Sequence, residues 1–212
     1  ISIPKTVLWT IEQLQEGGHE AYLVGGCVRD MLIGRNPNDW DITTNAVPEQ
    51  IIDVFEGTDR RVVYENNFGT VAIINKELEA DDTAYAIEIT PYRTESQYTD
   101  NRRPDNVTFA KTVQEDLSRR DFTINAMAYD PTTKKLIDDF GGQEMIVSKT
   151  ISTVGDPSER FSEDALRIMR AVRFSAQLGF SIEEETLSSL TSLSSSHFKF
   201  IIKIIYNYNI YR

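Results

Sequence analysis

Residues 21–44 read AYLVGGCVRDMLIGRNPNDWDITT, and the rest of the chain is best understood from this segment outward. The pattern predicts a short apolar strand over Ala21–Val24, a turn at Gly25 and Gly26, and a short helix that begins near Cys27. Glycine lacks a Cβ, so its backbone N–H group can approach a phosphate closely, and the positive end of the following helix points to the same place. We therefore expect an anion-binding turn.

Two aspartates close this segment. If residues 39–42 form a strand, the carboxylates of Asp39 and Asp41 point to one side, while Trp40 and Ile42 point to the other. Two carboxylates beside an anion-binding turn suit divalent cations that hold a triphosphate and activate a hydroxyl group. A plain turn followed by a solvated acidic loop is the alternative, because each pattern is also common without a ligand.

Composition narrows the class of protein. The chain has 212 residues, 40% hydrophobic and 26% charged, as in a soluble globular protein. No apolar run approaches a membrane span and no signal peptide is evident, so we expect a cytoplasmic protein with no membrane partner. The single cysteine, Cys27, excludes an internal disulfide, and we expect a buried residue rather than a nucleophile. A net charge of −11 argues against a strong nonspecific nucleic-acid binder, but not against a nucleotide enzyme.

The remaining elements are expected from periodicity and from turn residues. We expect helices over 4–17, from Pro48 to Phe55 and near 143–148, and strands over 61–64, 70–74, 84–90, 107–109 and 136–140. Residues 91–104 are polar and indicate a mobile surface loop. Glu88 lies on the polar face of the strand over 84–90. Either it faces solvent, or it is a third carboxylate that faces Asp39 and Asp41 from a neighbouring strand.

Two arginine patterns follow. Arg119 and Arg120 precede the apolar start of an expected helix over 121–126, and they are either an exposed basic pair or a guanidinium fork that clamps phosphates. From residue 158 the sequence is strongly helical. A row of side chains recurs there every third residue and winds slowly along one side of a single helix: Asp164, Arg167, Arg170 and Arg173. This row is either a solvated face or a group that matches the hydrogen-bonding edge of a nucleobase.

The composition changes at residues 155–157, so we predict an α+β domain over residues 1–150 and a helical domain over 151–212. The last 20 or so residues fit neither a helix nor a strand, and we expect an interrupted or truncated C-terminus. The chain has no internal repeats.

Motifs from both domains carry a resemblance to a known family. In chain order they are Gly25-Gly26-x-Val28-Arg29-Asp30, Asp39-Trp40-Asp41, Arg119-Arg120-Asp121-Phe122-Thr123-Ile124-Asn125-Ala126, Gly155-Asp156-Pro157 with Arg160-Phe161, and Glu163-Asp164-Ala165-Leu166-Arg167. The series closely resembles the bacterial class II tRNA nucleotidyltransferases, the CCA-adding enzymes. The related bacterial poly(A) polymerases share these motifs. The resemblance runs from about residue 20 to residue 187, and family members continue for well over a hundred further residues.

The resemblance implies a fold and a set of roles. The fold is a polymerase-beta-type nucleotidyltransferase head, with a small mixed sheet and flanking helices, followed by an all-helical neck. Magnesium ions would be held by Asp39 and Asp41, with Glu88 as a weaker candidate. The residues implied in nucleotide binding are Gly25, Gly26, Arg29, Arg120, Asn125, Asp164, Arg167, Arg170 and Arg173. Within this set, Asp164 and Arg167 would read the base, and the loop near 91–104 resembles one that helps the switch from CTP to ATP.

The implied function is template-independent transfer of CMP and AMP from CTP and ATP to the 3′ end of tRNA, with Mg²⁺ as cofactor. The implied partners are therefore tRNA, CTP and ATP. Two alternatives stay open: addition of A alone or of poly(A), and a truncated nucleotide- or RNA-binding fragment without activity.

Overall fold

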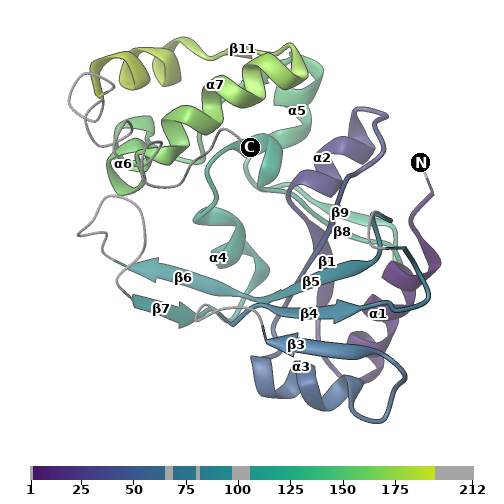
Figure 1. Ribbon diagram of the computed structural model, residues 1–212. Coiled ribbons are helices and arrows are strands. Elements are labelled where there is room, and N and C mark those ends of the chain that lie inside the picture. Colours follow the sequence, from purple (N-terminus) through teal and green to yellow (C-terminus); the bar gives the residue numbers. More distant parts are fainter. Residues whose placement is uncertain (1, 65–68, 80–81, 97–105, 194–212) are drawn as a thin grey trace.

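The computed structural model describes residues 2–64, 69–79, 82–96 and 106–193. A seven-stranded mixed sheet forms the lower part of the molecule in Figure 1, and two neck helices lie above it. The strands, in spatial order, are β3 (Arg61–Tyr64), β4 (Val71–Ile74), β5 (Ala86–Pro91), β2 (Trp40–Thr44), β1 (Ala21–Val24), β8 (Ala128–Asp130) and β9 (Lys135–Ile137). Neighbouring strands are antiparallel except β2 and β5, which are parallel. The α+β head expected from the sequence is confirmed.

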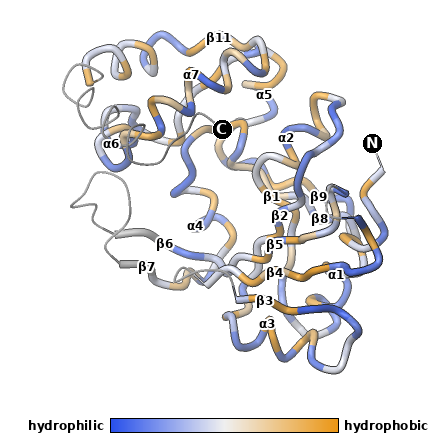
Figure 2. The backbone as a smooth tube through the Cα atoms, in the orientation of Figure 1, coloured by the Kyte–Doolittle hydropathy of each residue, from blue (hydrophilic) through white to orange (hydrophobic). Residues whose placement is uncertain are grey.

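Alternation along the central strands separates the core from the polar face. Trp40 and Ile42 of β2 are buried in the main hydrophobic cluster, together with Ile87 and Ile89 of β5. The helices α1 (Lys5–Glu16) and α3 (Pro48–Phe55) cover this face and add apolar side chains to the same cluster. The trace of β4 is largely hydrophobic in Figure 2, as expected for a strand inside this core. Asp41 must therefore lie on the opposite face.

A second, smaller layer stands on that opposite face. Helix α4 (Val113–Ser118) packs there beside the two-stranded ribbon of β6 (Arg93–Ser96) and β7 (Asn106–Phe109). The apolar residues that hold this layer are Val24, Tyr92, Val113, Leu117 and Ala128. Helix α2 (Gly26–Leu32) follows β1 and contacts β1, β2 and the 3₁₀ turn η1 (Thr123–Asn125). This layer carries most of the charged motifs.

The neck packs on the head through its own hydrophobic cluster. It comprises α6 (Pro157–Glu163), α7 (Leu166–Leu178) and a helical segment over 184–193, and it is reached through α5 (Gly142–Val147). Beside these helices, β10 (Thr150–Ile151) pairs in parallel with β11 (Ser181–Ile182) over two residues. Phe122 and Ile124 from the arginine motif lie in the same cluster as Phe161, Ile168 and Phe174 of the neck. The motif segment over 119–126 therefore joins head and neck.

Three expectations about local structure were wrong. Residues 121–126 do not start a helix: Thr123–Asn125 form a single 3₁₀ turn, because Phe122 is bridged to Thr153 and the chain must then enter β8 beside β1. The start of the surface loop expected over 91–104 is a strand instead, since Arg93–Ser96 pair with Asn106–Phe109. Residues 97–105 lie outside the described part of the chain.

The third error concerns the neck helix. The expected single helix is broken between α6 and α7, because Asp164 has extended backbone angles (φ −138°, ψ 106°). Its carboxylate accepts a hydrogen bond from the Leu166 N–H at 2.9 Å, which satisfies a donor at the start of α7. Asp164 therefore does not share a helix with the three arginines. In the residues that the structure describes, none of the helices is long and apolar enough to cross a membrane.

Adjacent isoleucines on α3 test the assignment of the core. Ile51 is fully buried, whereas Ile52 is 39% exposed. We expect Ile51→Ala to lower the free energy of unfolding by about 2–5 kcal/mol, because it leaves a cavity in the main cluster. The control Ile52→Ala should cost about 0.5 kcal/mol or less. Urea denaturation followed by circular dichroism measures both, and equal losses would contradict the placement of α3.

Candidate active site

A cavity of about 360 Å³ lies where α2, the start of β2, the arginine motif and α7 meet. Its lining is polar, and it gathers nine of the twelve residues predicted from the sequence: Gly25, Gly26, Arg29, Asp39, Asp41, Arg120, Asn125, Arg170 and Arg173. These residues come from four separate segments of the chain. The fold therefore brings the separate motifs to one place.

Gly25 shapes the wall of this cavity. Its backbone has φ +77° and ψ −132°, a conformation open to glycine alone, and it caps α2 without a side-chain hydrogen bond. A Cβ at this position would stand 3.1 Å from Nη1 of Arg120 and 3.9 Å from Oδ2 of Asp41. Glycine is thus needed both for the turn and for the close approach of a guanidinium group.

The acidic side of the cavity is formed by Asp39 and Asp41. β2 begins at Trp40, so Asp39 lies in the bend just before the strand. The strand considered over residues 39–42 therefore starts one residue later than expected. Asp41 is paired in register with Glu88 of the parallel strand β5. Burial, and then the charges of Asp39 and Glu88, raise the pKa of Asp41 to about 7, against the opposing effect of Arg120. Glu88 itself lies outside this cavity, on the far side of Asp41.

This crowding of negative charge fits a divalent cation. Among the described residues, no group of three His, Cys, Asp or Glu side chains is arranged to enclose a metal ion. Mg²⁺, however, is commonly bound by one or two carboxylates, with water and substrate phosphates as its other ligands. Asp39 and Asp41 match that mode, since a cation would offset the repulsion that raises the pKa of Asp41.

Arg119 and Arg120 are held in place by a carboxylate that the sequence analysis missed. Asp116 is fully buried, and its two oxygens accept hydrogen bonds from Arg119 at 2.8 and 3.0 Å and from Arg120 at 3.1 Å. Burial would raise the pKa of Asp116, but the two guanidinium groups outweigh it and hold the pKa below its usual value. The Thr43 hydroxyl, on β2 next to Asp41, bonds the same carboxylate at 3.3 Å.

A second chain of polar contacts runs from α2 to the neck. Arg29 donates to Oδ1 of Asn125 at 2.7 Å, and Asn125 donates to Oδ1 of Asp121 at 3.4 Å. Asp121 in turn accepts a bond of 2.5 Å from Nε of Arg170 on α7. Asp30 also accepts two bonds from Arg29, at 2.8 and 2.9 Å. Asn125 is therefore a link between charged groups, and Asp121 is a cavity residue that the sequence analysis did not assign.

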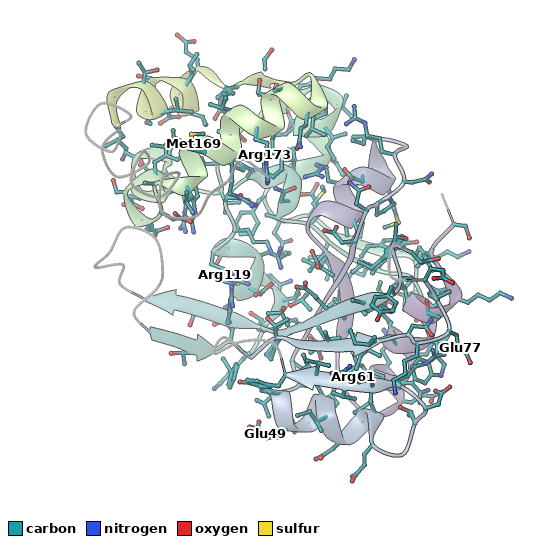
Figure 3. All side chains as sticks on the ribbon, viewed as in Figure 1. Glu49, Arg61, Glu77, Arg119, Met169 and Arg173 are labelled. Carbon is teal, nitrogen blue, oxygen red and sulfur yellow. The ribbon has the colours of Figure 1, made fainter. Side chains whose placement is uncertain are left out.

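Three guanidinium groups gather around one aromatic ring. The Cζ atoms of Arg29, Arg170 and Arg173 lie 5.2, 5.2 and 5.1 Å from the ring centroid of Phe174. Burial, followed by the charge of Arg170, lowers the pKa of Arg173. Phe174 packs edge-on against Phe122 of the head. In Figure 3, Arg173 lies on α7 above the head, whereas Arg119 lies below the neck, near β6.

Asp164 and Arg167 do not line the cavity. Arg167 is buried, and it donates to Glu163 at 2.6 Å and to the backbone carbonyls of Arg160 and Arg119, both at 3.3 Å. The break between α6 and α7 separates Asp164 from α7. Arg167 shares α7 with Arg170 and Arg173, but its guanidinium group is bonded to Glu163 and the two carbonyls.

Some of these features had a recognisable sequence signature and others did not. Cys27 is buried, donates to the Val24 carbonyl and has a pKa raised by burial to about 12, so it is no nucleophile.

Asp121 was visible inside the arginine motif. Asp116, three and four residues before the arginines, fits the helical spacing of an ion pair. Nothing in the sequence marked Phe174 beyond its aromatic ring.

Comparison with known proteins gives a consistent result. A model described as the poly A polymerase head domain matches residues 21–152. A CCA-adding enzyme of Geobacillus sp. (strain WCH70) is 49% identical over 183 residues, 86% of this chain and 43% of the relative. A CCA-adding enzyme of Enterococcus faecalis is 48% identical over 180 residues, which are 85% of this chain and 42% of the relative.

Solved structures agree. The CCA-adding enzyme of Bacillus stearothermophilus in complex with CTP is similar with a TM-score of 0.74 and 39% identity, over 88% of this chain and 43% of that one. A tRNA nucleotidyltransferase complexed with a primer tRNA and an incoming ATP analog is similar with a TM-score of 0.68 and 30% identity. The match covers 86% of this chain and 49% of that one. The chain thus spans less than half the length of these relatives.

Gly25→Ala tests the contact between the turn and Arg120. The added methyl group must displace the guanidinium, so we expect tripolyphosphate to bind at least about fivefold more weakly, equivalent to about 1 kcal/mol. Gly34→Ala is the control, because Gly34 also has positive φ (+76°) but nothing within 4 Å of an added Cβ. Isothermal titration calorimetry measures both, and unchanged affinity in Gly25→Ala would contradict the assignment.

The raised pKa of Asp41 has a consequence for stability in EDTA. Its folded-state pKa of about 7 exceeds the unfolded value of 3.8, so its ionisation costs stability as pH rises from 4 through 7. Asp41→Asn removes this cost. We expect the variant to be more stable than the parent chain at pH 8, by up to roughly 4 kcal/mol, and similar to it at pH 4.

Chemical denaturation at both pH values measures the difference between Asp41→Asn and the parent chain. The exposed Asp53 provides a matched control, and Asp53→Asn should change little. A stability difference that does not grow between pH 4 and pH 8 would show that burial and the neighbouring charges do not raise the pKa of Asp41.

Proposed function

The chain belongs to the family described as the poly A polymerase head domain, and we propose that it adds nucleotides to the 3′ end of tRNA. The proposed reaction is the template-independent transfer of CMP and AMP from CTP and ATP, with release of pyrophosphate. The relatives named CCA-adding enzymes support this product, as does the related structure with a primer tRNA and an ATP analog. We also propose that this reaction takes place in the cytoplasm.

One observation carries the proposal. One cavity is lined both by the carboxylates of Asp39 and Asp41 and by arginines from α2, from α7 and from the segment after α4. Nucleotidyl transfer needs both parts: carboxylates that bind cations at the reacting phosphate, and guanidinium groups that hold a polyanion and stabilise the charge on the leaving group. A nucleotide site without chemistry would need only the second part.

We assign Mg²⁺ to Asp39 and Asp41, where it would lower the pKa of the attacking hydroxyl and stabilise the leaving pyrophosphate. The cavity residues supply the remaining functions. Arg120 and the backbone at Gly25 and Gly26 face the triphosphate, and the guanidinium groups around Phe174 stabilise its negative charge. No side chain of the protein needs to act as a nucleophile, because the RNA hydroxyl takes that role.

Base selection remains assigned to Asp164 and Arg167. Their support is the position of Arg167, whose hydrogen bond to the Arg119 carbonyl joins it to the arginine motif. In this structure the Glu163 carboxylate accepts a hydrogen bond of 2.6 Å from the Arg167 guanidinium group. A nucleobase would therefore have to replace Glu163 or approach the remaining edge of the guanidinium group. Arg170 and Arg173 line the cavity directly.

Two other outcomes follow from specific observations. The family model is described as a poly A polymerase domain, which favours addition of A alone or of a poly(A) tail. The chain covers 43% of its Geobacillus relative, which favours a fragment that binds nucleotide without turnover. The number and the kind of nucleotides added, or the absence of any addition, distinguish these two alternatives from CCA addition.

The decisive experiment uses tRNA that lacks its terminal CCA, with Mg²⁺ and labelled nucleotides. We expect two nucleotides to be added from CTP alone and three from CTP and ATP together, resolved on a sequencing gel. Asp39→Ala should reduce the rate at least about a hundredfold, because a cation ligand is lost while the fold is kept. A ladder from ATP alone would instead indicate poly(A) addition. Magnesium-dependent CTP binding without any extension would indicate a fragment without activity.

A further inference from the structure

The three arginines around Phe174 are not equivalent. Arg29 and Arg170 each donate a hydrogen bond to a carboxylate, at 2.8 and 2.5 Å. Arg173 forms no ion pair and no hydrogen bond through its side chain with the residues that the structure describes. Its guanidinium group instead lies over the Phe174 ring, with Cζ 5.1 Å from the ring centroid. Arg173 is therefore the cation of this group that an aromatic ring, and no carboxylate, holds at contact distance.

We propose that Phe174 is a positioning residue of the triphosphate site, whose ring holds the Arg173 guanidinium group toward the phosphates. The inference rests on the proposed function, because it assigns a further residue to the same site. In this arrangement Arg173 supplies the positive charge, and Phe174 determines where that charge lies before the ligand binds.

Helix geometry alone does not place Arg173 over this ring. Adjacent residues of an α-helix point about 100° apart, so their side chains do not face each other. Arg170 differs, because it lies four residues before Phe174 and reaches the ring along the same side of α7. The Arg173 side chain has to bend across the helix surface to reach the ring of the next residue. A long, exposed side chain would adopt many rotamers without such a contact, and ordering it would weaken ligand binding.

The Phe174 ring is itself fixed in place. It is 6% exposed, and it packs edge-on against Phe122 of the head, with ring centroids 5.8 Å apart. The face of an aromatic ring carries partial negative charge, so it attracts a guanidinium group without neutralising it. The ring also takes none of the planar N–H donors of Arg173, whereas a carboxylate would compete with phosphate oxygens for them. A fixed ring can thus orient Arg173 and leave its charge and donors for the ligand.

Repulsion between the arginines gives this contact its importance. Burial lowers the pKa of Arg173, and the charges of Arg170 and Arg29 lower it further, whereas Asp121 opposes them. A cation repelled from a cavity by its neighbours turns to solvent when solvent is within reach, and Arg173 is exposed. Attraction to the ring opposes that movement, so the positive charge stays at the cavity that Arg173 lines.

A double-mutant cycle on tripolyphosphate binding tests the inference. Isothermal titration calorimetry in EDTA measures the affinity without a bridging cation. We expect Arg173→Gln to weaken binding at least about tenfold in the parent chain, the loss of a charged hydrogen bond. In the Phe174→Leu background, where Arg173 is no longer oriented, the same change should weaken binding less than about threefold. Equal losses in both backgrounds would overturn the inference, because the ring would then act through packing alone.

Phe180→Leu is the matched control. Phe180 is 7% exposed and belongs to the same hydrophobic cluster as Phe174, but within the described ranges its ring contacts no guanidinium group. We expect Phe174→Leu to weaken tripolyphosphate binding at least about fivefold, and Phe180→Leu less than about twofold. Phe174→Tyr keeps the ring face and should stay within about twofold of the parent chain. Equal weakening in the two leucine variants would overturn the inference.

Thermal melts establish that each variant is folded. If Phe174→Leu does not fold, Phe174→Met takes its place in the cycle, because methionine adapts to irregular space in a core. Tripolyphosphate binding needs no turnover, so the cycle is independent of nucleotide addition. If no nucleotide is ever added to tRNA, the proposed function fails, and the cycle still decides the role of Phe174. If nucleotides are added but the two losses are equal, the inference fails alone.

Discussion

The buried carboxylate of Asp116 is the contact on which both halves of the candidate site depend. A fully buried charge is costly unless it is paired and hydrogen-bonded, and here two guanidinium groups, one hydroxyl and one backbone N–H converge on it. The arrangement works in both directions, because the same bonds that satisfy the carboxylate restrict the rotamers of Arg119 and Arg120. Both arginines are thus fixed before any ligand arrives, which lowers the ordering entropy that binding would otherwise cost. Since Thr43 lies two residues from Asp41 on the same face of β2, the network also fixes the arginines relative to the Asp41 carboxylate.

The neck is tied to this centre through side chains rather than through the sheet. Arg29, Asn125, Asp121 and Arg170 form a continuous series of hydrogen bonds from α2 to α7. Phe174 adds an apolar anchor, because it packs on Phe122 of the head while its ring accepts guanidinium groups. A helix that carried only solvated arginines would have no reason to bury an aromatic ring among them. Packing places Arg170 and Arg173 at the cavity, and their contact with a nucleobase stays a prediction.

Much of the centre could be predicted from the sequence, because it depends on local geometry. The alternation of Trp40 and Ile42 with Asp41 is a property of any half-buried strand, and it places the carboxylate correctly. The register between Asp41 and Glu88 could not be predicted, since parallel pairing is set by the whole sheet. The break at Asp164 was missed because helical periodicity does not reveal that a carboxylate can cap the next helix. Asp116 was overlooked because an acidic residue in a short helix is usually solvated, and only the tertiary structure shows that it is buried.

The distribution of charge explains how an acidic chain can hold a triphosphate. The cavity is lined by four arginines and four aspartates, so it is formally neutral. The signs are nevertheless unevenly distributed. Asp39 and Asp41 stand at one end, whereas three arginines surround Phe174 at the other, two of them bonded to Asp30 and Asp121. Arg120 lies at the boundary, close enough to Asp41 to oppose the rise in its pKa. A neutral cavity with separated charges would attract neither a free anion nor a free cation strongly. It would instead favour a nucleoside triphosphate together with its cations, whose own charges are separated in the same sense. The overall charge of −11 opposes nonspecific binding of polyanions.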